Sequence, residues 1–352
     1  MTSIPEQTAR AWAEVNLGAV VANARTVATV AGTRLLPMVK ANGYGVGAVP
    51  VTRALEAIDP WGYGVVTVQE GAELRAAGIT RPIVVFSPLT PQLVGAHLSH
   101  GLRPTIGDAN ALSVWRAAGS KPFHIEIDTG MSRSGFRFDA ESSWRDQLVD
   151  AEGWEGVFTH FHSADQDDTA VRQQWDRFRT VLALLPGRPP LVHAANSAAA
   201  LLGKTYACDM VRPGIFLYGG AAGGYSAEPV VRLRAPVVAV REVKAGDTVS
   251  YGATWKAPRD CRVATLSIGY GDGLLRSLSN QGAVEIGGRV LSIVGRVTMD
   301  FTMFAIDQRV AIGDIATLFG GLVSVDEQAR RAGTVSYELL TAMGVRVERR
   351  YQ

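Results

Sequence analysis

Up to about residue 220, the chain repeats one pattern: a short run rich in Val and Ile, a turn, and a stretch whose apolar residues have helical spacing. Strands that alternate with helices form a parallel sheet, and about eight such units predict a closed (β/α)8 barrel of the TIM type. The helical stretches include residues 69–77, 109–118, 169–185 and 197–202. The predicted strands are residues 35–41, 62–67, 82–87, 103–106, 123–128, 156–161, 191–195 and 210–216.

After about residue 220 the pattern changes. Residues 221–226 are small and flexible, and short strand-like runs separated by turns follow them. This predicts a barrel domain over residues 1–225 and a β-rich C-terminal domain over residues 226–352, with a first strand near residues 11–16 as a candidate to join the β domain. The later strand-like runs are residues 237–243, 262–268, 283–286, 291–297, 301–306 and 315–318, and helical patterns return at 325–332 and from 336.

Composition limits the possible partners. The 352 residues exceed one compact core, and 47% hydrophobic with 19% charged residues is typical of a globular protein. A net charge of +2 gives no reason to expect a nucleic acid or a membrane as partner. Cys208 and Cys261 lack CxxC spacing, which argues against a disulfide framework and a zinc site. We see neither a signal peptide nor an apolar run of about 20 residues, and therefore expect a cytoplasmic protein.

Lys40 stands at the end of the first predicted strand, directly before a glycine-rich turn over residues 43–47. An amine at this position, beside backbone N–H groups made accessible by glycines, suits a Schiff base to an aldehyde that carries an anionic group. A solvated lysine and a surface tyrosine, Tyr44, are the plainer interpretation of the same residues. The turn is therefore a candidate site whose chemistry depends on the rest of the chain.

Two further strand ends carry charged or ionisable side chains. Glu126 and Asp128 alternate on one face of a strand, and Arg133 offers the opposite charge. The group is either part of an active site or a structural ion pair. His160 and His162 have the spacing of two ligands on one strand face, but without a clear third ligand we predict no metal site.

The last two predicted strands end in residues that suit a phosphate. Ser197 is a good N-cap for the helical run after it, and a helix N-terminus binds anions. Asn196 precedes it. Arg212 lies on the final strand, and Gly214 and Ile215 can donate backbone N–H groups to phosphate oxygens.

Residues 39–45, Val-Lys-Ala-Asn-Gly-Tyr-Gly, resemble the pyridoxal-phosphate lysine motif of the alanine racemase family. Six further segments resemble motifs of that family and occur in the expected order. They are residues 128–135, 194–197, 210–215, 249–254, 268–273 and 295–300. The resemblance extends from about Trp12 to Arg349. It implies the cofactor pyridoxal 5'-phosphate, a small amino acid as substrate with alanine first, and D-alanine for the peptidoglycan of the cell wall.

The resemblance also implies a role for individual residues. Lys40 and Tyr251 exchange protons on opposite faces of the substrate, and Tyr251 comes from the partner subunit, so the active sites of a homodimer are composite. The substrate contacts are Arg133 and Met299, and the access channel includes Tyr270 and Asp300. The cofactor contacts are Lys40, Tyr44, His160, Asn196, Ser197, Arg212, Gly214 and Ile215.

Arg212 indicates which reaction such a site favours. An arginine that faces the pyridine nitrogen keeps its own proton and leaves that nitrogen unprotonated, so the ring is a weaker electron sink than it is beside an aspartate. This fits a racemase better than a transaminase. His160 is expected to form a hydrogen bond with Arg212.

The chain also departs from the family pattern. Glu126 stands where many members carry a carbamylated lysine, and Gly43 and Val46 replace the usual alanine and a frequent histidine. Near the C-terminus, Val345 and Glu348 stand in place of a tyrosine and a proline, so one phosphate contact is expected to be missing. Two alternatives remain open: a serine or broad-specificity racemase on the same scaffold, and a non-catalytic pyridoxal-phosphate carrier, which would need neither the β domain nor Tyr251.

Overall fold

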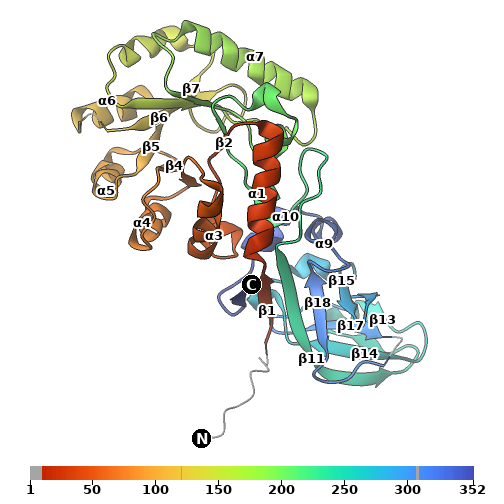
Figure 1. The fold of residues 1–352 in the computed structure, drawn as a ribbon. Coiled ribbons are helices and arrows are strands. Elements are labelled where there is room, and N and C mark those ends of the chain that lie inside the picture. Colours follow the sequence, from red (N-terminus) through yellow and green to blue (C-terminus); the bar gives the residue numbers. More distant parts are fainter. Residues whose placement is uncertain (1–9, 120, 307–308) are drawn as a thin grey trace, which may run out of the picture.

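The computed structural model describes residues 10–119, 121–306 and 309–352, and its first part is a parallel barrel (Figure 1). Six strands are neighbours in sequence order and run parallel, and a second parallel pair joins the first and last strands. The short strand β7 (Phe136–Arg137) adds to β6. The eight barrel strands are β2 (Arg34–Leu35), β3 (Tyr63–Val65), β4 (Ile83–Pro88), β5 (Arg103–Ile106), β6 (Phe123–Asp128), β8 (Trp154–Phe158), β9 (Leu191–His193) and β10 (Met210–Val211).

Backbone contacts close these strands into a ring. A parallel bridge between Met38 and Gly64 joins the segment after β2 to β3. At the other side, the N–H of Arg212 donates to the carbonyl of Ala195 at 2.8 Å, which joins the ends of β10 and β9. The predicted (β/α)8 barrel is therefore confirmed, although most strands are shorter than predicted.

Helices cover the outside of the strands (Figure 1). In α7 (Asp168–Leu184), Val171, Phe178 and Val181 are buried at helical spacing, which gives the helix one apolar face toward the barrel. The predicted helices occur within one residue of their expected bounds. The other barrel helices are α1 (Leu17–Ala31), α3 (Ala48–Leu55), α4 (Val68–Ala76), α5 (Val94–Ser99), α6 (Ala109–Ala117) and α8 (Ser197–Leu201).

The second part is built around β11 (Val231–Val243), a strand of 13 residues that pairs with β1, β14 and β18. The first strand, β1 (Trp12–Val15), lies antiparallel to β11 and parallel to β19 (Glu348–Tyr351). The remaining elements are β12 (Thr248–Val249), β13 (Trp255–Lys256), β14 (Cys261–Leu266), β15 (Ala283–Ile286), β16 (Arg289–Ser292), β17 (Thr302–Ile306), β18 (Ile315–Phe319), α9 (Val325–Ala332) and α10 (Ser336–Thr341).

The C-terminal segment contacts the barrel next to Lys40. The guanidinium of Arg349 donates to the carbonyl of Gly45 at 3.0 Å, and the hydroxyl of Tyr351 donates to the carbonyl of Val46 at 2.9 Å. These bonds fix the glycine-rich turn from the side of the β-rich part. Within the described ranges, no helix is long and apolar enough to cross a membrane.

Candidate active site

A cavity of about 130 Å³ opens at the C-terminal ends of the barrel strands. Nine of the predicted site residues line it, although they follow five different strands along the chain. The position is the one expected for the functional site of such a barrel. The lining residues are Met38, Lys40, Tyr44, Phe86, Arg133, His160, Asn196, Ser197, Arg212, Gly214, Ile215 and Tyr337.

Lys40 begins a left-handed turn rather than the end of a strand. The predicted strand over residues 35–41 stops at Leu35 as regular structure, and Ala41, Asn42 and Tyr44 each have φ of 52°. A left-handed conformation costs a residue other than glycine roughly 1–2 kcal/mol, so surrounding contacts must hold this turn. Such strain is typical of functional sites.

Glu70 supplies one of these contacts. Its carboxylate accepts the N–H of Ala41 at 2.7 Å and also the N–H groups of Val66 and Thr67, where it completes a capping box with Thr67 at the start of α4. The sequence analysis missed Glu70, but the Thr67-x-x-Glu70 pattern is a recognisable capping-box signal. Glu70 thereby connects the turn after Lys40 to the neighbouring βα unit.

The Lys40 amine lies in an electropositive part of the cavity. Burial lowers its pKa, and the positive charge of Arg133 lowers it further, whereas the carboxylate of Glu70 acts in the opposite direction. A lysine whose pKa is lowered in this way has a larger neutral fraction, and the neutral amine is the form that acts as a nucleophile or base.

Arg212 is buried and its guanidinium is held by four acceptors. Nη2 donates to the carbonyls of Thr159 and Ala194 at 2.8 and 2.9 Å and lies 3.3 Å from Nδ1 of His160, while Nη1 lies 2.7 Å from Nδ1 of His193. Burial lowers the pKa of Arg212 to about 10, so it remains a cation at neutral pH.

His160 is a neutral acceptor in this arrangement. Burial and the nearby charge of Arg212 lower its pKa to about 3. Since a guanidinium can only donate, Nδ1 of His160 must accept from Arg212. His162 is exposed and forms a 2.6 Å hydrogen bond with Ser163 instead. The described part of the chain contains no group of three potential metal ligands.

Glu126 is buried behind the exposed Arg133. Its Oε1 lies 3.8 Å from Nη2 of Arg133, and its Oε2 accepts the hydroxyl of Ser134 at 2.7 Å. Burial raises the pKa of Glu126, although Ser134 and Arg133 act against this shift. Asp128 points elsewhere: its Oδ1 accepts the N–H groups of Gly130 and Ser132, which folds the turn that presents Arg133.

The expected N-cap role of Ser197 is wrong. The N-cap of α8 is Asn196, whose side chain accepts the N–H of Ala199 at 3.1 Å. Ser197 occupies the first helical position, and its Oγ accepts the N–H of Gly214 at 2.8 Å. The side chain of Ser197 therefore joins the start of α8 to the loop after β10.

Tyr44 lies at the same end of the cavity. Its ring stacks on Tyr218 with centroids 4.4 Å apart. A Cβ atom at position 214 would lie 2.2 Å from the Tyr44 hydroxyl, so only glycine fits opposite it. Burial raises the pKa of Tyr44, which keeps the phenol protonated.

Tyr337 is a cavity residue that the sequence analysis missed. It belongs to α10, and its ring centroid lies 6.0 Å from that of Tyr44. Burial raises the pKa of Tyr337 to about 12. The expectation of a missing contact was based on Val345, which is fully exposed; the C-terminal segment does bring a phenol to the cavity, from a position eight residues earlier in the chain.

The cavity fits an aromatic ring that carries an anionic group. Lys40, Arg133 and Arg212 supply positive charge, and none of its described lining residues is an aspartate or a glutamate. Met38 and Phe86 offer apolar surface to a ring. The chemistry of these side chains therefore agrees with pyridoxal 5'-phosphate as the occupant.

Four predicted residues lie outside this cavity, on the β-rich part. Tyr251, Tyr270 and Met299 are exposed, and Tyr251 borders a different cavity together with Phe301. Asp300 accepts the guanidinium of Arg346 at 2.8 Å. One chain alone therefore does not bring these four residues to Lys40.

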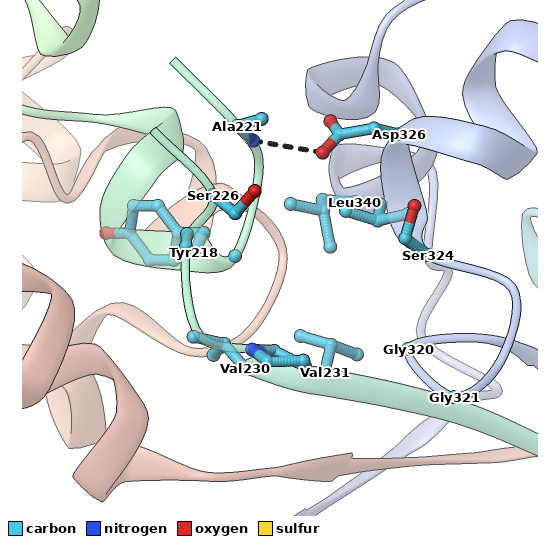
Figure 2. A pocket seen from close by; sticks show the side chains of 14 residues that line it. Tyr218, Ala221, Ser226, Val230, Val231, Gly320, Gly321, Ser324, Asp326 and Leu340 are labelled. Atoms are coloured by element: carbon cyan, nitrogen blue, oxygen red, sulfur yellow. Dashed lines mark hydrogen bonds between the residues drawn. The ribbon is translucent and has the colours of Figure 1, made fainter. Parts of the chain in front are cut away.

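A further cavity of about 150 Å³ lies on the other side of Tyr218 (Figure 2). Figure 2 shows Val230 and Val231 along one edge, with Asp326 and Leu340 facing Tyr218; the N–H of Ala221 donates to Asp326 at 2.9 Å. This cavity shares no described lining residue with the one around Lys40. It marks the junction between the barrel and the C-terminal helices.

Comparisons with known proteins identify the family of the chain. The sequence profile of the alanine racemase N-terminal domain matches residues 15–222, and that of the alanine racemase C-terminal domain matches residues 230–351. An alanine racemase of Carboxydothermus hydrogenoformans is 38% identical, with 97% of this chain and 99% of that protein covered. One of Halothermothrix orenii is 35% identical, with 97% and 96% covered.

Solved structures give the same result. The biosynthetic alanine racemase of Pseudomonas aeruginosa matches with a TM-score of 0.91 and 34% identity over 97% of this chain and 99% of that one. The alanine racemase of Bartonella henselae, described with covalently bound pyridoxal phosphate, matches with a TM-score of 0.91 and 30% identity over 98% and 100%. With both profiles and these relatives in agreement, the chain belongs to the alanine racemase family.

Proposed function

We propose that this protein racemises alanine with pyridoxal 5'-phosphate as its cofactor and with two bases, Lys40 and Tyr251, from two subunits. The observation that carries the proposal is that Lys40, Arg133 and Arg212 line one cavity, together with tyrosine side chains at an end that suits a phosphate. The cofactor, when bound, withdraws electrons from the α-carbon of the amino acid and so makes its proton acidic.

Lys40 is the base on one face of the substrate. Its lowered pKa supports this role, because the neutral amine can take a proton from the α-carbon at the working pH and return it. The left-handed turn and the bond from Ala41 to Glu70 hold the start of the lysine side chain in place. A fixed amine is what proton exchange on a single face requires.

Tyr251 of the partner subunit is the base on the opposite face. Its side chain is 73% exposed, and it lies beside apolar residues on the β-rich part, an environment that suits the covering of this surface by a second copy of the chain. Arg133 and Arg212 supply positive charge in the barrel cavity that this tyrosine would enter. This supports a homodimer with composite active sites.

Arg133 is proposed to bind the substrate carboxylate, with Met299 beside it and with Tyr270 and Asp300 at the access channel. Glu126, whose carboxylate is held by the hydroxyl of Ser134, attracts the arginine from the barrel interior. Arg212 would face the ring nitrogen and, as a cation held by four acceptors, would not transfer a proton to it. The phosphate would be held by Tyr44, Ser197, Gly214, Ile215 and Tyr337, with Asn196 nearby.

We propose domains over residues 1–225 and 226–352, with the β1 strand contributed to the β-rich domain, as its pairing with β11 supports. The two cysteines, Cys208 and Cys261, are free, which suits a reducing cytoplasm. D-Alanine made there would supply peptidoglycan synthesis.

The test is proton exchange in deuterated water. The purified protein, loaded with pyridoxal phosphate, is incubated with L-alanine, L-serine and a larger L-amino acid, and each product is analysed for chirality and deuterium. We expect fast formation of deuterated D-alanine. Faster turnover of serine would favour the serine or broad-specificity alternative, and a lack of exchange with every amino acid would contradict the proposed racemase.

A further inference from the structure

A line of side chains runs from the buried Arg212 through the barrel interior. Nη1 of Arg212 lies 2.7 Å from Nδ1 of His193, Nε2 of His193 lies 2.9 Å from Nδ1 of His124, and Nε2 of His124 lies 3.2 Å from Oε2 of Glu155. These residues belong to or follow four strands, β10, β9, β6 and β8. Only Arg212 borders the active-site cavity.

The chemistry of the groups fixes the direction of every hydrogen bond. Because a guanidinium can only donate, Nδ1 of His193 accepts and its proton sits on Nε2. This Nε2–H donates to Nδ1 of His124, which places the His124 proton on its own Nε2, where the carboxylate of Glu155 accepts it. The line therefore has matched donors and acceptors from one end to the other.

Both histidines are suited to orient their hydrogen-bond partners without carrying a charge themselves. They are fully buried, and burial lowers the pKa of each, so both imidazoles are neutral. The ring of His193 stacks on Phe158, with centroids 4.9 Å apart and an interplanar angle of 15°, which restricts its rotation. Two neutral rings thus separate the cation Arg212 from the anion Glu155.

Glu155 anchors the outer end of the line. Its side chain is 22% exposed, and Arg103 donates to its two carboxylate oxygens at 2.6 and 3.3 Å. Burial raises the pKa of Glu155, but the hydrogen bonds from His124 and Arg103 outweigh this effect and the net shift is downward. Glu155 is therefore an ionised, doubly held acceptor.

We propose that Glu155 is a positioning residue of the active site, which acts on Arg212 through His124 and His193. Its carboxylate selects the one proton arrangement in which His193 offers an acceptor to Arg212. If both histidines reversed their protons, His193 would present an N–H to the guanidinium, and two donors would face each other. The inference rests on the proposed function, because Arg212 affects the reaction only if it faces the cofactor ring.

The first measurement is the proton location on the histidines. In the cofactor-loaded protein labelled with 15N-histidine, long-range 1H–15N spectra at neutral pH distinguish the two neutral tautomers from the doubly protonated ring. We expect His124 and His193 both to be neutral with the proton on Nε2. A proton on Nδ1 of either residue, or a doubly protonated ring, would overturn the proposal.

The second measurement compares Glu155→Gln with Glu73→Gln, a matched change of an exposed glutamate on the barrel helix α4. For Glu155→Gln we expect a shifted absorption maximum of the bound cofactor, moved His193 signals and a fall in kcat of about tenfold, the effect of one weakened charge-assisted hydrogen bond. Glu73→Gln should match the wild type. Identical cofactor and histidine spectra in the two folded variants would overturn the proposal.

The experiments still give an answer if the variant does not fold or if the protein is not a racemase. If Glu155→Gln does not fold, the tautomers of the wild-type protein decide alone. If the wild-type protein binds pyridoxal phosphate but racemises no amino acid, the proposed function fails, whereas the cofactor absorption and histidine spectra still test whether Glu155 controls Arg212.

Discussion

Lys40 and Tyr251 of one chain line different cavities, the first inside the barrel mouth and the second on the exposed surface of the β-rich part. If both act on one substrate, a second chain must supply one of them. The arrangement predicts that each active site is divided between two subunits, which can be tested by mixing two inactive variants.

Lys40→Ala and Tyr251→Phe should each be inactive as homodimers. After unfolding and refolding together at equal concentration, half of the dimers are mixed, and each mixed dimer has one intact site, so activity should recover to about a quarter of the wild-type value. The measurement is racemisation by the refolded mixture, with each variant refolded alone as control. A mixture as inactive as its components would mean that the two residues act within one chain or not at all.

Glu126 should make substrate binding depend on pH. Its pKa is raised by burial, so in acid it takes up a proton while still in the folded state and no longer attracts Arg133. We expect KM for alanine to rise as pH falls through this raised pKa. In Glu126→Gln, KM should be about tenfold higher at neutral pH and should lose this dependence.

The control for this change is Asp139→Asn, which removes an exposed carboxylate paired with Arg137. It should leave KM and its pH dependence unaltered. An acid-side rise of KM that persists in Glu126→Gln would assign the titration to another group.

The same shift predicts a trend in stability. The native state binds the Glu126 proton more tightly than the unfolded chain, so the free energy of unfolding should decrease as pH rises from the ordinary glutamate pKa through the raised one. Urea unfolding of wild type and Glu126→Gln at several pH values measures this contribution as the difference between the two curves. Parallel curves would show that the carboxyl titrates alike in both states.

Much of the fold could be predicted from the sequence because it depends on local patterns. Val- and Ile-rich runs at regular intervals located the eight barrel strands, and their parallel order placed Lys40, Arg133 and Arg212 at one end of the barrel. The strand bounds were less accurate. Residues 41–45 adopt a left-handed turn that is held by Glu70 from another βα unit, and no local pattern around Lys40 encodes that contact.

The interior of the site was harder to predict. His124 and His193 are single histidines within apolar strands, and the sequence does not say which strand faces meet inside a barrel. Tyr337 was missed for a different reason: the family pattern indicated position 345, directly before the final arginine-rich segment, whereas α10 brings an earlier residue to the cavity.

Tyr337→Phe should weaken cofactor binding. Its phenol remains protonated because burial raises its pKa to about 12, and it can therefore donate to a phosphate at the end of the cavity that it shares with Tyr44. Loss of one hydrogen bond to a charged group should increase the dissociation constant of pyridoxal phosphate about tenfold. Fluorescence titration of the apoprotein measures it, and Val345→Ala, at a fully exposed position, should bind as the wild type does. Equal affinity of Tyr337→Phe and wild type would remove Tyr337 from the phosphate site.

Gly214→Ala should affect both stability and cofactor binding. The added Cβ would lie 2.2 Å from the hydroxyl of Tyr44, whose ring is confined by its stacking on Tyr218. We expect a loss of about 1–3 kcal/mol in the free energy of unfolding, as for other overpacked positions, together with weaker binding of pyridoxal phosphate. Gly95→Ala is the matched control, because a Cβ there meets nothing within 4 Å. A Gly214→Ala variant that binds the cofactor normally would show that this end of the cavity can widen.

The pairing of β1 with β11 and β19 determines when the β-rich sheet can be completed. Trp12 is placed between Arg234 on one side and Glu348 on the other. During synthesis on the ribosome, β1 emerges first but has no sheet partner until β11 appears, and its second edge stays open until the last strand leaves the exit tunnel. The barrel strands can thus pair before β19 is synthesised, whereas the bonds from Arg349 and Tyr351 that steady the Lys40 turn form only after β19 has emerged, so catalytic competence should follow barrel formation in the new chain.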